Sequence, residues 1–422
     1  MNTSSNVVCL RQPDQIEDPL TDVLRAGARR LLAQAVELEA EAFLAGMRDL
    51  QLPDGRDRLV RHGHGPERLI QTGIGPVAVS RVKIRDRGAV GATDRIRFSS
   101  SILPKWARRT RSLDALLPVL YLRGVSMGDF QEALTALLGK DAPNLSPSVI
   151  TRLTAEWQAE YERWQARDLS ARRYVYLWAD GVYLQARMEE HAECMLVLIG
   201  ATPEGRKELV GFQVGVREST QSWRELLVEV KRRGLTMAPE LAVGDGALGF
   251  WRALDAVYPG TRHQRCWVHK AANVLNKVPK SVQPSMKADL REIHGSPTRA
   301  AAEAAIDVFA EKYGAKYAKA AACLTKDRDA LLALYDFPAE HWDHLRTTNP
   351  IESVFATVRH RTVRTKGSLS PVTARLMVFK LVMAASKTWR RLKGENQLPK
   401  VVAGVTFQDG TEVIERPSTR AA

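Results

Sequence analysis

Three acidic residues stand in sequence contexts where carboxylates are unusual. Asp180 lies inside the run YVYLWADGVYLQAR, whose β-branched and aromatic residues are typical of a strand buried in a sheet. A second apolar run, PELAVGDG, ends on Asp245, and Glu352 opens a helical stretch in an arginine-rich region. A buried carboxylate is costly unless a partner or a metal ion compensates it. Two strand-borne aspartates and one helix-borne glutamate can form an oxygen-rich site for two hard cations, which suits in-line phosphoryl transfer.

Each of these residues also has a plainer interpretation. Asp180, followed by glycine between alternating apolar residues, is a hairpin-turn signal. That signal does not explain Asp245, which is followed by glycine but precedes a helix. The sequence NPIE at 349–352 is a good helix cap, with Asn at the cap, Pro first and Glu third. Local sequence alone favours this capping role for Glu352, and a carboxylate in a first helical turn can still face a sheet.

The chain resembles the bacterial Mutator-like (IS256-type) transposases, which carry a DDE triad on an RNase H-like fold. The resemblance rests on the Asp-Gly pair at Asp180 and on three motifs in the family's order, VGDGALGFWRAL, HQRCWVHKAANVL and TTNPIESVFATVRHRT. It implies that Asp180, Asp245 and Glu352 are catalytic and hold two Mg²⁺ ions, with Mn²⁺ able to substitute. It also implies that Cys266 and His269, a C-x-x-H pair, support the active site.

The C-x-x-H pair has a zinc interpretation as well. Zinc would need two further ligands at suitable spacing. Only His263 and the distant Cys194 are candidates in the sequence. A buried cysteine beside a hydrogen-bonded histidine is therefore the preferred interpretation of Cys266 and His269.

Composition favours a polyanionic partner. The 422 residues include 62 Lys plus Arg against 48 Asp plus Glu, a formal charge of +14, which fits nucleic acid or an anionic membrane surface. We find no apolar run long enough to span a bilayer, no secretory signal pattern and no basic amphipathic anchor. The scattered cysteines show no disulfide framework. We therefore expect a cytoplasmic, nucleoid-associated bacterial protein without a membrane partner.

The elements that precede the acidic motifs are expected to bind DNA. Residues 1–18 are predicted to be disordered, and 19–110 to form a long amphipathic helix to Leu50 and a β-hairpin turning at Gly75-Pro76. Apolar positions of the helix, which we expect to pack on another domain or a second copy, include Leu24, Leu31 and Leu38. Four basic residues at alternate positions share one face of the hairpin, suited to phosphate contact or plain solvation: Arg81, Lys83, Arg85 and Arg87.

Residues 111–165 are predicted to form a helix-turn-helix-like DNA-binding domain. Its third helix would begin at Ser146-Pro147 and bring Ser148, Thr151 and Arg152 to the major groove. A small helical bundle is the alternative, and the charge together with the family resemblance favours DNA binding. Residues 166–173 form the linker to the catalytic domain.

An α/β fold is expected around the acidic residues. Strands are predicted at 174–187, 193–202, 207–214, 241–245 and 261–268, with helices at 219–233 and 248–257. Antiparallel strands followed by strand–helix units suit an RNase H-like, retroviral-integrase-type domain over 174–269 with helices on both faces. An α-helical insertion is predicted at 270–345. The domain then resumes at 346–395 with a helix over 371–393, before a loosely ordered tail at 396–422.

The densest basic cluster follows Glu352. It comprises Arg359, His360, Arg361, Arg364, Lys366, Arg375, Lys380, Lys387, Arg390, Arg391 and Lys393, opposed only by Glu395. A solvated helix face usually mixes charges of both signs. We therefore expect this segment to lead away from the metal ions along a DNA backbone.

A DDE transposase is the function that these features favour. By resemblance its substrates are double-stranded terminal inverted repeats and target DNA, bridged by a homodimer or a higher oligomer. The reaction would hydrolyse the element's ends and then join a 3′-hydroxyl to target DNA. Two alternatives remain open: an RNase H-like nuclease without strand transfer, and a non-catalytic DNA-binding repressor derived from a transposase.

Overall fold

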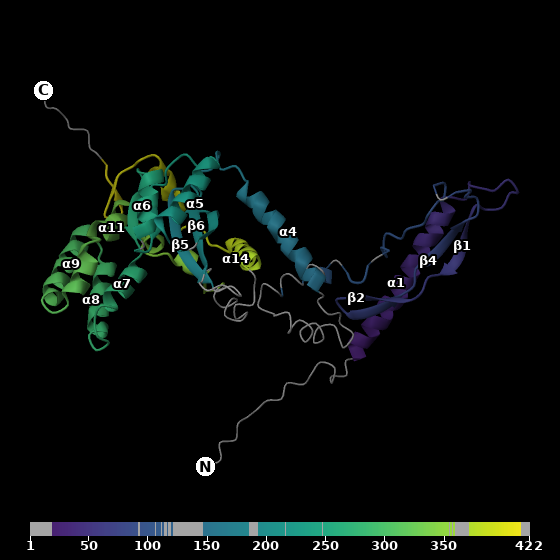
Figure 1. Cartoon of the computed structure of the whole chain (residues 1–422), viewed down its shortest axis with the longest axis horizontal. Coiled ribbons are helices and arrows are strands. Elements are labelled where there is room, and N and C mark those ends of the chain that lie inside the picture. Colours follow the sequence, from purple (N-terminus) through teal and green to yellow (C-terminus); the bar gives the residue numbers. More distant parts are fainter. Residues whose placement is uncertain are drawn as a thin grey trace, which may run out of the picture. The chain divides into compact units, whose positions relative to one another are not determined.

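The computed structural model describes two compact units of the chain. Described residues are 19–91, 93–105, 107–110, 147–184, 193–215, 217–246, 248–353 and 371–414, with isolated positions 112, 113, 116, 120, 355, 356 and 358. The chain divides into Met1–Leu153 and Thr154–Ala422, and each unit is considered by itself (Figure 1). Within the described segments, no helix is both long enough and apolar enough to cross a membrane.

In the first unit a long helix, α1 (Pro19–Ala45), packs on two small antiparallel sheets. Its buried residues are Val36 and Ala40, which contact a small core of residues from the strands. The helix ends five residues before the predicted Leu50. Leu24, Leu31 and Leu38 of the predicted apolar face are half or more exposed. The apolar spacing predicted the helix correctly. The two short sheets cover only a narrow stripe of it, and packing of the exposed leucines on a second copy stays a prediction.

The predicted hairpin is present, but its turn and its second half differ from the prediction. Strands β2 (Arg68–Thr72) and β3 (Gly75–Val79) pair around a turn at 73–74, so that Gly75-Pro76 begins β3 instead of forming the turn. Pro76 is tolerated there because β3 belongs to a two-stranded sheet and both of its strands are edges. Strand β4 (Val82–Asp86) leaves the hairpin and pairs with β1 (Leu59–His64).

The second unit is built on a five-stranded mixed sheet whose strands follow the predicted order. They are β5 (Tyr176–Leu184), β6 (Glu193–Ala201), β7 (Lys207–Gly215), β8 (Leu241–Gly244) and β9 (Arg262–Arg265), with α5 (Thr220–Arg232) and α6 (Leu248–Val257) between β7 and β9. The spatial order is β7-β6-β5-β8-β9. Neighbours are antiparallel from β7 to β5, whereas β8 and β9 run parallel to β5.

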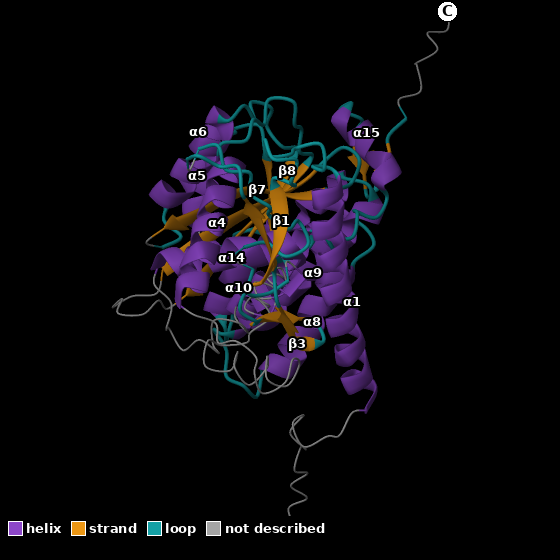
Figure 2. Cartoon of the chain, turned by 90° about the vertical axis from the view of Figure 1, so that its right-hand side faces the viewer, coloured by secondary structure: helices purple, strands orange, loops and turns teal. Residues whose placement is uncertain are grey.

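Helical segments of the second unit pack on both faces of this sheet. Figure 2 colours helices purple and strands orange. On one face, Leu177 and Ala179 join a core with Trp223 of α5 and Phe250 of α6. The alternate residues point to the other face, because side chains along a strand alternate. There the Tyr176 hydroxyl hydrogen-bonds His341 Nδ1 at 2.8 Å and Trp178 Nε1 donates to the carbonyl of His344 at 2.9 Å. Asp180 continues this second series.

The segment after β9 is helical, as predicted. Its helices are α7 (Trp267–Leu275), α8 (Gln283–Gly295), α9 (Arg299–Gly314), α10 (Ala318–Thr325), α11 (Arg328–Leu332), η2 (Ala333–Asp336), η3 (Ala339–His341) and α12 (Trp342–Leu345). Buried hydrogen bonds attach it to the end of β9: Gln264 Nε2 and Trp267 Nε1 both donate to the carbonyl of Leu331, at 3.0 and 3.1 Å. The insertion is therefore held firmly against the sheet.

Two further helices flank the sheet. The predicted third helix of the helix-turn-helix is α4 (Pro147–Gln165), and its Tyr161 and Trp164 contact Phe379 of α14 (Pro371–Ser386). The later part of α4 is thus packed within the second unit. The first two helices predicted for that domain lie almost entirely outside the described residues.

The expectation of a loosely ordered tail after Glu395 was wrong for residues 395–412. These form η4 (Glu395–Gln397), α15 (Leu398–Val402) and a hairpin of β10 (Phe407–Gln408) and β11 (Thr411–Glu412). Leu398, Val401 and Phe407 are buried. The hairpin is fixed by backbone hydrogen bonds from Gly410 N to Tyr335 O and from Ala339 N to Gly410 O, both 3.1 Å. Local sequence could not show these contacts, because their partners lie some 70 residues earlier in the chain.

Candidate active site

Asp180 lies in the middle of β5, paired with Val197 of β6, so the hairpin-turn interpretation was wrong. The residue is only 8% exposed. One carboxylate oxygen accepts the Gly181 N–H at 2.8 Å, and the other has no hydrogen-bond donor among the described residues. Burial is the main cause that raises the pKa of Asp180 to about 6; the charges of Asp245 and Glu352 contribute to the rise, and His269 and the Gly181 N–H oppose it. Asp180 is therefore a buried carboxylate with little compensation.

Asp245 immediately follows β8, the parallel neighbour of β5. The register pairs Ala179 with Gly244, so the next residues along the two strands are Asp180 and Asp245. Neighbouring strands lie about 4.8 Å apart, which makes the two aspartates neighbours. The backbone carbonyl of Asp245 accepts from Trp251 Nε1 at 2.8 Å and from Arg265 Nη1 at 3.0 Å.

Trp251 is buried in the core, and the Arg265 guanidinium lies 4.6 Å from the centre of its ring. This aromatic residue has a packing role. Its indole N–H holds the backbone at Asp245, and its ring packs in the core, as buried tryptophans commonly do.

Glu352 lies on a helical segment that begins at 349, one residue earlier than the capping interpretation required. The N–H groups of Ile351 and Glu352 donate to the carbonyl of Thr348, at 2.8 and 3.0 Å, so Thr348 is the capping residue. The predicted cap, Asn349, is already helical. The capping box was therefore wrong: the Glu352 carboxylate does not reach back to the cap backbone but accepts from the Thr348 hydroxyl at 2.8 Å.

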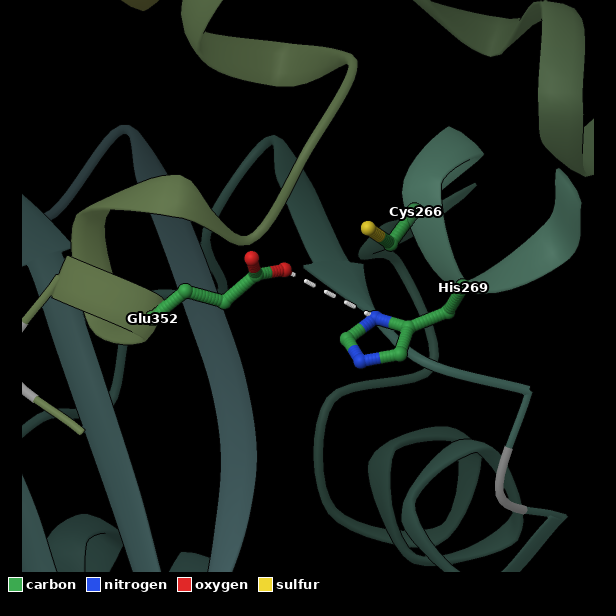
Figure 3. A group of neighbouring side chains, drawn as sticks. All are labelled: Cys266, His269 and Glu352. Carbon is green, nitrogen blue, oxygen red and sulfur yellow. Dashed lines mark ion pairs between the residues drawn. The ribbon is translucent and has the colours of Figure 1, made fainter. Parts of the chain in front are cut away.

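A polar network connects the C-x-x-H pair to Glu352 (Figure 3). Thr348 is completely buried; its N–H donates to Cys266 Sγ at 3.4 Å, and its hydroxyl lies 3.5 Å from the same sulfur. His269 Nδ1 lies 3.9 Å from Glu352 Oε1. The neighbouring Cys266 is the main cause that raises the pKa of His269 to about 9; the charges of Asp245 and Asp180 contribute, and burial opposes the rise. This rise favours the protonated imidazole.

The zinc ligands considered from the sequence do not join this pair. His263 Nε2 lies 2.8 Å from Asp255, and Cys194 is buried in the core beneath α5. The third potential ligand is Glu352, whose oxygen lies within 4.8 Å of the Cys266 and His269 ligand atoms. Across the described residues this is the only such group found. It has one ligand fewer than a structural zinc site uses.

The motifs did not indicate Glu218, a further carboxylate in the neighbourhood of Asp180. It lies just before α5, and its charge interacts with those of Asp180 and Asp245. Its only sequence signal, an acidic residue before a helix start, is also typical of an ordinary solvated position. Thr348 was missed for a similar reason, because a threonine beside the expected cap has no distinctive pattern.

The predicted DNA-contacting residues have three different outcomes. The alternation on β4 is confirmed: Arg81, Arg85 and Arg87 are exposed and Lys83 is half-buried, whereas Val82 and Asp86 between them are buried. Within the described part of the chain, these four basic side chains form no ion pair. Arg152 is exposed on α4; the side chains of Ser148 and Thr151 lie outside the described set, as do Arg359, His360, Arg361, Arg364 and Lys366.

In the later part of the predicted basic cluster, four of the basic side chains have polar or acidic partners. Arg375 donates to Gln158, Lys380 pairs with Glu160 at 2.6 Å, Arg391 with Glu395 at 3.2 Å and Lys393 with Asp343 at 2.8 Å. For Arg375, Lys380 and Lys393 the partners come from segments 50 to 220 residues away. Lys387 and Arg390 are exposed, and DNA contact by this segment stays a prediction.

Comparison with known proteins places this arrangement in a family. The model of the Mutator family of transposases matches residues 2–391. The transposase of insertion sequence element IS6120 from Mycolicibacterium smegmatis is 51% identical over 306 residues, 72% of this chain and 94% of the relative. The transposase of insertion sequence element IST2 from Acidithiobacillus ferrooxidans is 52% identical over 287 residues, which are 66% of this chain and 95% of the relative. The IS256 transposase of transposon Tn4001 from Staphylococcus aureus is 27% identical over 299 residues, which are 70% of this chain and 73% of the relative. The chain belongs to the Mutator family of transposases.

Proposed function

We propose that this transposase cleaves and joins DNA by a two-metal mechanism, with Asp180, Asp245 and Glu352 as ligands of two Mg²⁺ ions. The observation that supports the proposal is that Asp180 and Asp245 are adjacent across two paired strands and that the charge of Glu352 acts on Asp180, although the three carboxylates do not form a group whose ligand atoms all lie within 4.8 Å of one another. Asp180 and Asp245 follow one another across the β5–β8 register, and Glu352 comes from a helix more than 100 residues later. Asp180 interacts electrostatically with both of the others.

The donor set fits hard divalent cations. All three proposed ligands are carboxylates, which Mg²⁺ and Mn²⁺ prefer over softer metals. Asp180 is more than nine-tenths buried, and its second oxygen lacks a hydrogen-bond donor in the described structure. A carboxylate in this position is destabilised by burial and by its like-charged neighbours, and a bound cation removes both costs.

The chain's own residues hold the proposed ligands in place. The Thr348 hydroxyl donates to Glu352 Oε1 and orients it, and His269 Nδ1 lies 3.9 Å from the same oxygen. Trp251 and Arg265 fix the backbone of Asp245. The chemistry supplied by bound Mg²⁺ is activation of the attacking oxygen and stabilisation of the leaving oxygen in an in-line displacement.

The wider interpretation is an RNase H-like catalytic unit joined to a DNA-binding unit. An antiparallel β5–β6–β7 meander extended by the parallel strands β8 and β9, with helices on both faces, supports this fold. The stripe Arg81, Lys83 and Arg85 supports phosphate contact by the first unit. The DNA substrates are terminal inverted repeats and target DNA, and two element ends require a dimer or a larger assembly.

The test is cleavage and strand transfer by Asp180→Asn, Asp245→Asn and Glu352→Gln on inverted-repeat DNA with Mg²⁺. Each variant should fold, bind DNA and lose at least about a hundredfold of both activities, since each removes a ligand. Glu340→Gln, an exposed acid in η3, is the control and should be fully active. Retained cleavage and joining in Glu352→Gln would reject that residue as a ligand. Cleavage without joining of a pre-cut end would indicate a nuclease, and DNA binding without Mg²⁺-dependent cleavage a repressor.

A further inference from the structure

Glu218 approaches β5 through space left by a glycine. A Cβ atom placed on Gly181, the residue after Asp180, would lie 2.6 Å from Glu218 Oε1. Likewise, a Cβ on Gly249, in the first turn of α6, would lie 2.6 Å from the backbone oxygen of Glu218. Any larger residue at either position would displace Glu218. The two glycines thus allow this glutamate to lie beside the proposed metal ligands.

The carboxylate of Glu218 has no protein partner that explains its position. Among the described residues it makes no side-chain hydrogen bond and no ion pair; only its backbone N–H donates, to Tyr183, at 3.4 Å. It does not cap α5, because Ser219 is the cap and accepts from Ser222 N. Burial raises the pKa of Glu218 to about 7, Asp180 and Asp245 add to the rise, and His269 opposes it. A carboxylate placed here without compensation is destabilising.

We propose that Glu218 is a fourth carboxylate of the metal site and helps to bind the divalent cation held by Asp180 and Asp245. The inference rests on the two-metal function proposed above. Since Gly181 and Asp180 face opposite sides of β5, Glu218 reaches the cluster from the side covered by α5 and α6. Glu352 approaches from the helix capped by Thr348. Four carboxylates would balance the charge of two divalent cations.

The test is Mn²⁺ binding to the full-length protein without DNA, measured by titration calorimetry and by the metal-induced rise in Tm. Glu218→Gln should weaken Mn²⁺ binding by about tenfold or more, as loss of a metal-supporting residue typically does. Its metal-free form should be at least as stable as the wild type, because a buried charge has been removed. Glu225→Gln, an exposed acid on α5, is the matched control and should bind Mn²⁺ normally.

A second pair of variants keeps the test decisive if Glu218→Gln folds poorly. Glu218→Asp retains the charge but shortens its reach, and Gly181→Ala retains Glu218 but occupies its space. Both should weaken Mn²⁺ binding while circular dichroism shows a native fold. Wild-type affinity in folded Glu218 variants, alongside weakened binding in Asp180→Asn, would overturn this role of Glu218 and leave the proposed function standing. Wild-type affinity in Asp180→Asn and Glu352→Gln as well would overturn the proposed metal site itself.

Discussion

Two buried aspartates on strands, one in each unit, have opposite surroundings. The Asp86 carboxylate on β4 accepts from Arg58 Nε at 2.9 Å and Nη2 at 3.1 Å, and from the N–H groups of Gly88 and Ile96, both at 2.9 Å. The Arg58 hydrogen bonds hold its pKa well below the usual range. Among the residues that the structure describes, Asp180 accepts only the N–H of its neighbour, and burial is the main cause that raises its pKa to about 6. A buried carboxylate surrounded by donors serves the fold, whereas one left short of donors indicates a place for a cation.

The strongest test of this contrast is stability. Asp86→Ala leaves the Arg58 guanidinium and two backbone N–H groups without their acceptor, and should lower the Tm of the first unit by about 5 °C or more. Asp180→Asn should not lower the Tm of the metal-free protein, because it removes a poorly compensated charge. Scanning calorimetry of both variants in EDTA measures the difference. Equal destabilisation would show that Asp180 is structural in the same sense as Asp86.

Strand β4 buries Asp86 on one side and presents basic side chains on the other. A structural role and a DNA-binding role can therefore be tested separately on the same strand. Combined replacement of Arg81, Lys83 and Arg85 by Ala should weaken binding to inverted-repeat DNA about tenfold or more. The slope of log affinity against log salt should fall by about 0.9 for each DNA phosphate that the variant no longer neutralises. A control replacing three exposed lysines of the insertion with Ala (Lys280, Lys316 and Lys319) should have a smaller effect. An unchanged slope in the β4 variant would mean that the stripe is merely solvated.

The hydrogen bonding of Glu352 offers a finer comparison with Asp86. One donor, the Thr348 hydroxyl, orients the Glu352 carboxylate, whereas several donors hold that of Asp86. Thr348→Val removes the hydrogen bond to Glu352 Oε1 and should lower the cleavage rate about tenfold with DNA affinity unchanged. Thr348→Ser should restore most of the rate. Thr347→Val is the matched control, because the Thr347 hydroxyl accepts from Asn349 N and does not contact Glu352. Equal losses in Thr347→Val and Thr348→Val would point to a general effect on the helix start.

The smallest expected effect is a difference in pH dependence. The folded-state pKa of Asp180, about 6, lies above the ordinary 3.8, so between these values the folded protein binds more protons than the unfolded chain. The contribution of Asp180 to the free energy of unfolding is therefore present below pH 3.8 and is lost as the pH rises to about 6. For Asp86 the shift is downward, so its stability is present above pH 3.8 and is lost on acidification. Urea unfolding in EDTA should show that Asp180→Asn gains stability relative to the wild type between about pH 4.5 and 6.5. If the difference in unfolding free energy between Asp180→Asn and the wild type stays constant over this pH range, the raised pKa of Asp180 is contradicted.

Much of the catalytic unit could be predicted from local sequence. The strands around Asp180 and Asp245, the two helices between β7 and β9 and the helical insertion all follow from periodicity and composition. The cap of the Glu352 helix could not, because Thr348 and Asn349 are both acceptable caps. The choice depends on Thr348 being buried against Cys266. The pairing of β4 with β1 was also missed, because hairpin signals describe only adjacent strands.

The sequence by itself determined the order of the elements and the positions of the acidic residues on them, since strand and helix periodicity and turn residues act over a few neighbouring positions. Tertiary structure alone decided which charges remain without partners. Glu218 lies against β5 only because Gly181 leaves room for it, and Lys380 and Lys393 pair with acids from distant segments. The physical reason is that burial and pairing depend on which segments pack together, and packing joins residues whose separation along the chain carries no local signal.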